Sequence, residues 1–198
     1  MKIIPADPSR MIDLPGVGPC PRPVDIDQSV TGFNRLKSLR IYRFAAGPAI
    51  EGESEVDEVY IVALDGAAQM QITGAHPLAA DLAPGHALYM TPHHAYRLTP
   101  QSDALIAYSR AEAAGTVPTH AVGEAGDRAE HLRFRVTPLE GGTDLPTDPA
   151  RERLVHVVAG QVLAGIDLVS ASQTLALRAG EVLPITAEGA AEVLVVSA

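Results

Sequence analysis

The sequence predicts an all-β protein built from two copies of one unit, and three observations lead to that prediction. The 198 residues contain many short apolar runs, each of strand length and bounded by Gly, Pro, Asp or Asn. No window of about 12 residues sustains the apolar period of an amphipathic helix. Finally, the spacing of several residues in the first half recurs in the second half.

Residues 1–38 are predicted to form an extended arm, because prolines restrict the backbone and donate no hydrogen bond to a helix or a β-ladder. The prolines of this arm are Pro5, Pro8, Pro15, Pro19, Pro21 and Pro23. Such an arm would pack across the body of the protein or onto a second subunit, and we expect a homodimer. The predicted strands of the first half follow, and they are LRIYRF (39–44), VYIVAL (59–64), AQMQI (68–72), HALYM (86–90) and ALIAYS (104–109).

Residues 111–130 are rich in small residues and glycine, which is typical of a linker with room for a helical turn. Strand-like runs then resume, and they are LRFRV (132–136), RLVHVVA (153–159), VLAGIDLV (162–169), TLAL (174–177), VLPI (182–185) and EVLVVS (192–197).

Composition excludes several functional classes. With 24 acidic and 15 basic residues the formal net charge is −9, so the chain lacks the basic face that nucleic acids or anionic membranes require. The single cysteine, Cys20, excludes an intrachain disulfide and a metal-binding cysteine pair. No apolar run approaches the roughly 18 residues of a membrane helix. We expect a soluble, cytoplasmic protein.

The repeat becomes visible when the chain is compared with itself. A shift of 94 residues superposes Gly47 on Gly141, Glu58 on Glu152 and Gly66 on Gly160. A shift of 95 residues superposes Leu82 on Leu177, Gly85 on Gly180 and Leu88 on Leu183. One additional residue between these two blocks is what a loop insertion would leave. The order and spacing therefore predict a duplicated unit.

Both halves, from about residue 39 onward, resemble the cupin superfamily. The resemblance implies a tandem double-stranded β-helix, that is, a bicupin of two jelly-roll barrels at 39–110 and 131–198, joined by the linker 111–130 and preceded by the arm 1–38. The family's metal ligands are three histidines and one glutamate in each barrel. The corresponding positions here are Glu53, Glu55, Val59 and Tyr96 in the first half, and Thr147, Pro149, Arg153 and Ala191 in the second half.

This comparison predicts that the chain holds no metal. The second set offers no competent ligands, and the guanidinium of Arg153 would repel a cation. Two carboxylates and a phenol from Glu53, Glu55 and Tyr96 would make an oxygen site if they converged. The simpler interpretation of Glu53 and Glu55 is a solvated acidic loop.

The first half also resembles the bicupin sugar isomerases that include 5-deoxy-glucuronate isomerase and 4-deoxy-threo-hexosulose-uronate ketol-isomerase. The segments that carry this resemblance are AAG, VYIVALDG and PGHALYMTPHH. In that group a zinc ion occupies the second barrel, where this chain lacks the ligand residues. The resemblance thus supports the predicted architecture, while the missing zinc ligands argue against isomerase activity.

Several side chains are candidates for binding a ligand. A pocket in the first half is expected to be lined by Glu53, Tyr89, Tyr96 and either His93 or His94, because adjacent residues of an extended chain point to opposite sides. On its strand, Arg153 has the opposite parity from His156, so that if Arg153 faces the interior then His156 faces out. Inside a barrel, Arg153 would pair with an acid or bind a carboxylate or phosphate; otherwise it bends to the rim and into water.

Three functions remain open on these grounds. The first is a metal-free bicupin that binds a small polar metabolite such as a sugar acid. The second is a uronate-type sugar isomerase whose acid and base are drawn from Glu53, Glu55, His93 and Tyr96. The third is a ligand-free oligomerising scaffold.

Overall fold

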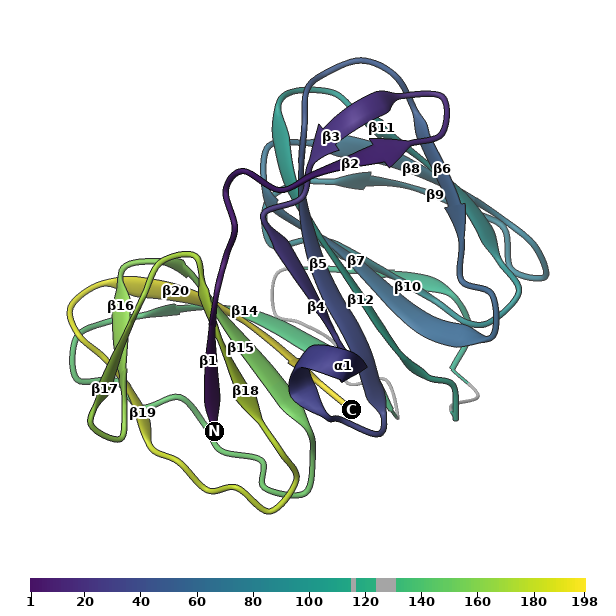
Figure 1. Cartoon of the computed structure of the whole chain (residues 1–198). Coiled ribbons are helices and arrows are strands. Elements are labelled where there is room, and N and C mark those ends of the chain that lie inside the picture. Colours follow the sequence, from purple (N-terminus) through teal and green to yellow (C-terminus); the bar gives the residue numbers. More distant parts are fainter. Residues whose placement is uncertain (115–116, 124–130) are drawn as a thin grey trace.

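The computed structural model describes residues 1–114, 117–123 and 131–198. Its strands form two β-sandwiches that lie side by side (Figure 1). Each sandwich has one larger and one smaller antiparallel sheet, and the two larger sheets lie in the middle of the molecule. The all-β prediction of a jelly-roll fold is confirmed.

In the first sandwich a six-stranded sheet faces a four-stranded sheet. The six-stranded sheet has the order β13 (His120–Val122), β10 (Ala87–Met90), β7 (Asp57–Asp65), β12 (Ala104–Glu112), β5 (Leu36–Phe44) and β4 (Val24–Asp27). The four-stranded sheet has the order β6 (Ile50–Glu53), β11 (Ala95–Pro100), β8 (Ala68–Thr73) and β9 (Leu78–Leu82). Alternate side chains such as Val59, Ile61, Met70 and Ile106 fill the space between the two sheets.

The second sandwich is smaller. Its larger sheet has the order β1 (Lys2–Pro5), β18 (Gln173–Leu177), β15 (Arg153–Ala159), β20 (Ala191–Ser197) and β14 (Arg133–Leu139). Its smaller sheet has the order β17 (Asp167–Ser170), β16 (Gln161–Ala164) and β19 (Ile185–Ala187). Val155, Val157, Leu175 and Val193 belong to the core between these two sheets.

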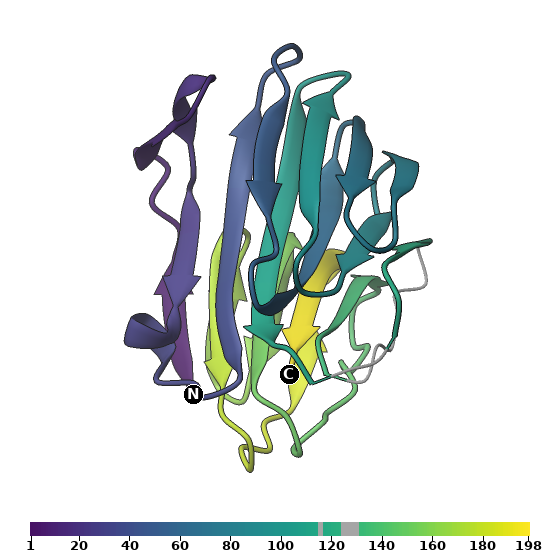
Figure 2. The ribbon, with the colours of Figure 1, turned by 90° about the vertical axis from the view of Figure 1, so that its right-hand side faces the viewer.

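A third core joins the two sandwiches. The outer face of the six-stranded sheet packs on the outer face of the five-stranded sheet, so that Tyr60 and Leu39 share a cluster with Phe134, Leu154 and Leu194. Strand β7 consequently has both faces buried, from Asp57 to Leu64. This double burial explains why VYIVAL is a continuous apolar run and does not alternate with polar residues. Figure 2, seen from the side of the first sandwich, shows strands of that sandwich partly in front of strands of the second.

The arm contains more structure than its prolines suggest. Strands β1 and β4 extend the two larger sheets, β2 (Met11–Leu14) and β3 (Gly18–Pro21) form a hairpin, and α1 (Gln28–Thr31) is a single turn of helix. The prediction that prolines keep this segment out of β-ladders is wrong. Strands β1 and β4 are sheet edges and the hairpin has only two strands, so a proline there can turn its donor-free nitrogen away from the ladder.

Two glycines that the 94-residue shift superposes have similar backbone conformations and surroundings. Gly66 has φ +72° and Gly160 has φ +74°. A Cβ at Gly66 would collide with the backbone of Asp103 and Ala104, and a Cβ at Gly160 would collide with that of Ala190 and Ala191. Only glycine tolerates both the left-handed backbone and this close approach.

Two predicted strands are wrong in detail. The run 162–169 is a hairpin of β16 and β17, because Gly165 adopts φ +64° and reverses the chain. Of the run 182–185 only Ile185 is in a strand, and Pro184 precedes it. The predicted linker 111–130 contains the end of β12 and strand β13, while its residues 115–116 and 124–130 lie outside the described residues.

Candidate functional site

The first sandwich has an arginine at one end of its interior. Along β12, Ile106, Tyr108 and Arg110 alternate toward the four-stranded sheet, and Arg110 comes last. Its Nε donates to Tyr108 Oη (3.0 Å), and its Nη2 donates to the carbonyl oxygen of Glu53 (2.7 Å). Its Nη1 donates to Glu55 Oε2 (2.6 Å). Every nitrogen of this guanidinium therefore has a partner.

Acidic and basic side chains surround this arginine. Asp57 lies 3.6 Å from Arg110 Nη1 and accepts a 2.6 Å hydrogen bond from Lys37 Nζ. The hydrogen bond and charge of Arg110 hold the pKa of Glu55 below its usual value, so Glu55 stays ionised. Burial raises the pKa of the Tyr108 phenol, so that group stays protonated. These ion pairs and hydrogen bonds attach the turn that precedes β7 to strand β12.

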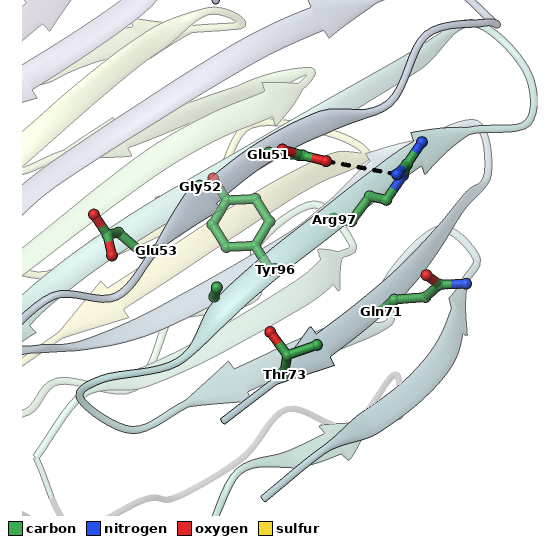
Figure 3. A pocket seen from close by; sticks show the side chains of 8 residues that line it. Glu51, Gly52, Glu53, Gln71, Thr73, Tyr96 and Arg97 are labelled. Atoms are coloured by element: carbon green, nitrogen blue, oxygen red, sulfur yellow. Dashed lines mark ion pairs between the residues drawn. The ribbon is translucent and has the colours of Figure 1, made fainter. Parts of the chain in front are cut away.

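A groove of about 550 Å³ lies on the outside of the four-stranded sheet (Figure 3). Strands β6, β8 and β11 each send alternate side chains to this face, and the exposed polar residues that line it are Glu51, Glu53, Gln71, Thr73 and Arg97. Arg97 Nη1 and Glu51 Oε1 are 3.5 Å apart, and both side chains are more than half exposed (58% and 73%). The groove thus offers amide and hydroxyl groups, carboxylates and one cation.

Tyr96 forms the wall between this groove and a small internal cavity. The cavity has a volume of about 70 Å³ and is lined by the rings of Tyr42, Tyr96 and Tyr108 together with aliphatic side chains. Tyr96 and Glu51 line both the groove and the cavity. The Tyr96 ring occupies the space beside Gly52, where a Cβ would lie 2.5 Å from Tyr96 Oη. Burial raises the pKa of Tyr96, so its phenol acts as a neutral donor or acceptor.

The two adjacent histidines have different environments. His93 is exposed and sits in a turn at φ +62°. His94 is buried; its Nδ1 lies 3.1 Å from the carbonyl oxygen of Thr91 and 2.9 Å from that of Pro92, and its Nε2 accepts from the backbone N–H of His76 (3.1 Å). These partners need a proton on Nδ1 and none on Nε2. The buried ring of His94 stabilises the turn through these hydrogen bonds. The expectation that His94 lines a pocket is therefore wrong.

The remaining candidates are also separated. Tyr89 is fully buried between the two sandwiches against Tyr60 and His120, because the alternation of β10 points Leu88 and Met90 into the first sandwich and Tyr89 away from it. The expectation that Tyr89 lines the same pocket as Tyr96 is wrong for this reason. Arg153 lies in the second sandwich. Of the sequence candidates, the groove brings together only Glu53 and Tyr96.

The residues present do not fit the divalent metal that the cupin resemblance implies. Glu53 lines the outer groove, Glu55 is bound by Arg110, and Tyr96 packs against Gly52. In the described part of the chain, no three His, Cys, Asp or Glu side chains are grouped so as to hold a metal ion. Arg110 adds a positive charge beside the two first-half carboxylate positions, which disfavours a second cation.

Comparisons with known proteins agree on the fold. The model of the KduI/IolB family matches residues 22–132. An IolB-like protein from Salmonella typhimurium LT2 superposes with a TM-score of 0.71 at 14% identity, over 89% of this chain and 88% of that one. A bacterial pirin in complex with nickel(II) from Escherichia coli gives 0.70 at 15%, over 99% and 98%. Quercetin 2,3-dioxygenase from Acinetobacter baumannii gives 0.71 at 13%, over 100% and 85%.

No curated protein matches the sequence. Among the described residues, no helix is long and apolar enough to cross a membrane.

Proposed function

Because the chain belongs to the KduI/IolB family, we propose that it is a metal-free bicupin that binds a small polar metabolite of the sugar-acid type in the groove over β6, β8 and β11. The observation that carries this proposal is the groove itself, which combines volume with a mixed set of polar groups. A sugar acid presents several hydroxyl groups and one carboxylate. Gln71, Thr73 and Glu53 supply partners for hydroxyl groups, and Arg97 supplies the partner for a carboxylate.

The Arg97–Glu51 ion pair supports this assignment. An exposed pair at 3.5 Å contributes about 0–1 kcal/mol, so a ligand carboxylate displaces Glu51 at little cost. Ala95 and the partly buried edge of Tyr96 supply the apolar part of the groove lining, against which a sugar ring can pack. Arg97 was not among the sequence candidates because β11 itself was not predicted from the sequence.

The isomerase alternative lacks a matching arrangement. Acid–base chemistry needs each titratable group to lie within hydrogen-bond reach of the substrate atom that loses or gains the proton. Glu55 is held ionised by Arg110, His93 lies on a turn, and neither lines the groove that contains Glu53 and Tyr96. Binding without turnover therefore agrees better with the geometry, and an isomerisation assay on uronates separates the two functions.

We expect D-glucuronate and D-gluconate to raise the thermal midpoint of the purified protein, while D-glucose at the same concentration does not. Replacement of Arg97 by Met should weaken sugar-acid binding about tenfold or more in titration calorimetry, because a charge-assisted pair is lost. Arg135→Met removes the same charge from an exposed position on β14 and serves as the control. A wild-type protein that binds neither sugar acid would leave the scaffold function as the better explanation.

We expect protein purified without chelators to contain well under one equivalent of Fe, Mn, Ni or Zn by elemental analysis. The physical reason is that Arg110 and Arg153 occupy the two barrels where the cupin resemblance implies metal sites. A stoichiometric divalent metal that resists dialysis would contradict the metal-free proposal and favour the isomerase.

A further inference from the structure

The second sandwich contains a buried arginine. Arg153 begins β15 and lies on the same side of that strand as Val155 and Val157, which belong to the core of the second sandwich. Its neighbours across the ladder are Leu177 on β18 and Ser197 on β20. The residue is only 2% exposed. The side chain therefore does not bend to the rim and into water, and His156 lies on the opposite face.

The guanidinium of Arg153 is incompletely paired. Nη1 donates a long hydrogen bond to the carbonyl oxygen of Pro146 (3.4 Å). Nε and Nη2 are buried and have no hydrogen-bond partner among the described residues. The carboxylate of Asp148 pairs with Arg133 (3.8 Å) and Arg151 (3.5 Å). Within the described ranges no acidic residue forms an ion pair with Arg153, so an interior acid does not explain its burial.

The two unpaired nitrogens define the shape of the missing partner. Nε and Nη2 share one edge of the planar guanidinium, and their N–H bonds on that edge are parallel. A carboxylate matches this edge with two oxygen atoms, in the bidentate arrangement that arginine forms with acids. Nη1, which holds Pro146, lies on another edge and leaves this one free.

Energy also argues for a partner. An unpaired buried charge is destabilising, and burial lowers the pKa of Arg153 below its usual value. Arg110 in the first sandwich shows the contrasting case, in which every nitrogen is paired by the protein. Because Nε and Nη2 of Arg153 lack acceptors inside a core, the folded chain loses stability unless a ligand supplies those acceptors.

The connection between β14 and β15 contacts the guanidinium through the carbonyl oxygen of Pro146. Hydrogen bonds from Leu145 N to Ile185 O (2.8 Å) and from Gly180 N to Pro149 O (2.7 Å) hold this connection in place. Because Nε and Nη2 are buried, a ligand reaches them only when neighbouring residues move.

We propose that the second sandwich binds the carboxylate of a small organic acid on Nε and Nη2 of Arg153, in the interior of that sandwich. This site is separate from the groove on the first sandwich and does not depend on it. The ligand class is a compact monocarboxylate, since the neighbours Leu177 and Val155 are apolar and Ser197 is a small polar residue.

The test measures the thermal midpoint of the full chain in sodium acetate and sodium propionate against sodium chloride at equal ionic strength. We expect a carboxylate-specific rise in the midpoint for the wild type and for Arg97→Met, and its loss in Arg153→Met. We also expect Arg153→Met to have a midpoint equal to or above that of the wild type without ligand, because methionine fills the space without a charge.

The proposal is wrong if carboxylates do not raise the thermal midpoint of the wild type, or if they raise that of Arg153→Met equally. A thermal midpoint of ligand-free Arg153→Met below that of the wild type would also overturn it, because Arg153 would then have a purely structural role. A second measurement needs no folded variant. The Nε–H resonance of Arg153 in ¹⁵N-labelled wild-type protein should shift on acetate titration, and a resonance that does not move contradicts the site. Loss of glucuronate binding in Arg97→Met alone concerns only the groove, so the two proposals fail separately.

Discussion

Replacement of Glu152 by alanine is expected to lower the free energy of unfolding by roughly 3–5 kcal/mol. Glu152 is 7% exposed, and its carboxylate accepts three backbone hydrogen bonds from residues 34–36, where the chain enters β5. The donors are the N–H groups of Asn34 (2.6 Å), Arg35 (2.8 Å) and Leu36 (2.9 Å). Alanine would leave these donors without their acceptor. Each bond to a charged group contributes about 1.5–3 kcal/mol, and the expected loss is smaller than the sum of three such bonds because water reaches the exposed residues Asn34 and Arg35.

Urea unfolding at pH 7, followed by circular dichroism, measures this loss. Glu152→Gln should fall between the wild type and Glu152→Ala, because it keeps one oxygen acceptor but places an amide N–H₂ against a donor. Glu188→Ala, at an exposed position, is the matched control and should change the unfolding free energy by less than about 0.5 kcal/mol. A loss below 1 kcal/mol in Glu152→Ala would show that the segment 34–36 does not depend on this carboxylate.

Glu152 also shows what can be predicted by comparing the two halves of the sequence. A shift of 94 residues pairs Glu152 with Glu58, and both glutamates are buried and bind backbone N–H groups from distant segments. Glu58 accepts from Ala114 (3.1 Å) and Leu132 (3.0 Å), at either end of the connection between the sandwiches. The spacing of the sequence pairs these two positions, whereas the partners of the glutamates depend on how loops fold back.

The strands were predictable where burial leaves a strong pattern. Strand β7, buried on both faces, is a continuous apolar run, and β12 and β15 are similar. Strands β6, β9 and β11 were missed, because the outer faces of the four-stranded sheet carry polar or small residues and the apolar alternation is weak. Those missed strands include two of the three that build the groove.

The same limit explains the candidate site. Glu53 and Tyr96 were identified by counting from Gly47 and Gly85, but Gln71, Thr73 and Arg97 have no motif. Arg110 could have been found, because it continues the inward alternation of Ile106 and Tyr108 by one step. This guanidinium contacts Glu55, Asp57 and the carbonyl oxygen of Glu53. These residues are far from Arg110 in the sequence, so residue spacing does not predict the contacts.

The stability of the protein is expected to fall as the pH is lowered from about 6.5 to about 4, and His156 is the main reason. His156 is 4% exposed on the side of β15 that faces away from Arg153, and its Nδ1 lies 2.9 Å from Thr174 Oγ1. Burial lowers the pKa of His156 from 6.5 to about 4. The unfolded chain therefore binds a proton more tightly than the folded chain does.

The sign follows from this difference in proton affinity. Above pH 6.5 the imidazole is neutral in both states and contributes no pH dependence. Between pH 6.5 and 4 only the unfolded state gains the proton, so the unfolding free energy decreases, and below pH 4 the loss levels off at roughly 3 kcal/mol. Urea unfolding at half-unit pH intervals should show this slope in the wild type.

His156→Gln isolates the contribution of this one residue. Glutamine keeps a hydrogen-bonding group near Thr174 but does not titrate, so contributions from carboxylates cancel when the two proteins are compared. We expect the difference in unfolding free energy between wild type and variant to shrink by roughly 3 kcal/mol from pH 7 to pH 4. A difference that is independent of pH would mean that His156 gains its proton without unfolding, and that the core between β15 and β18 admits the charge.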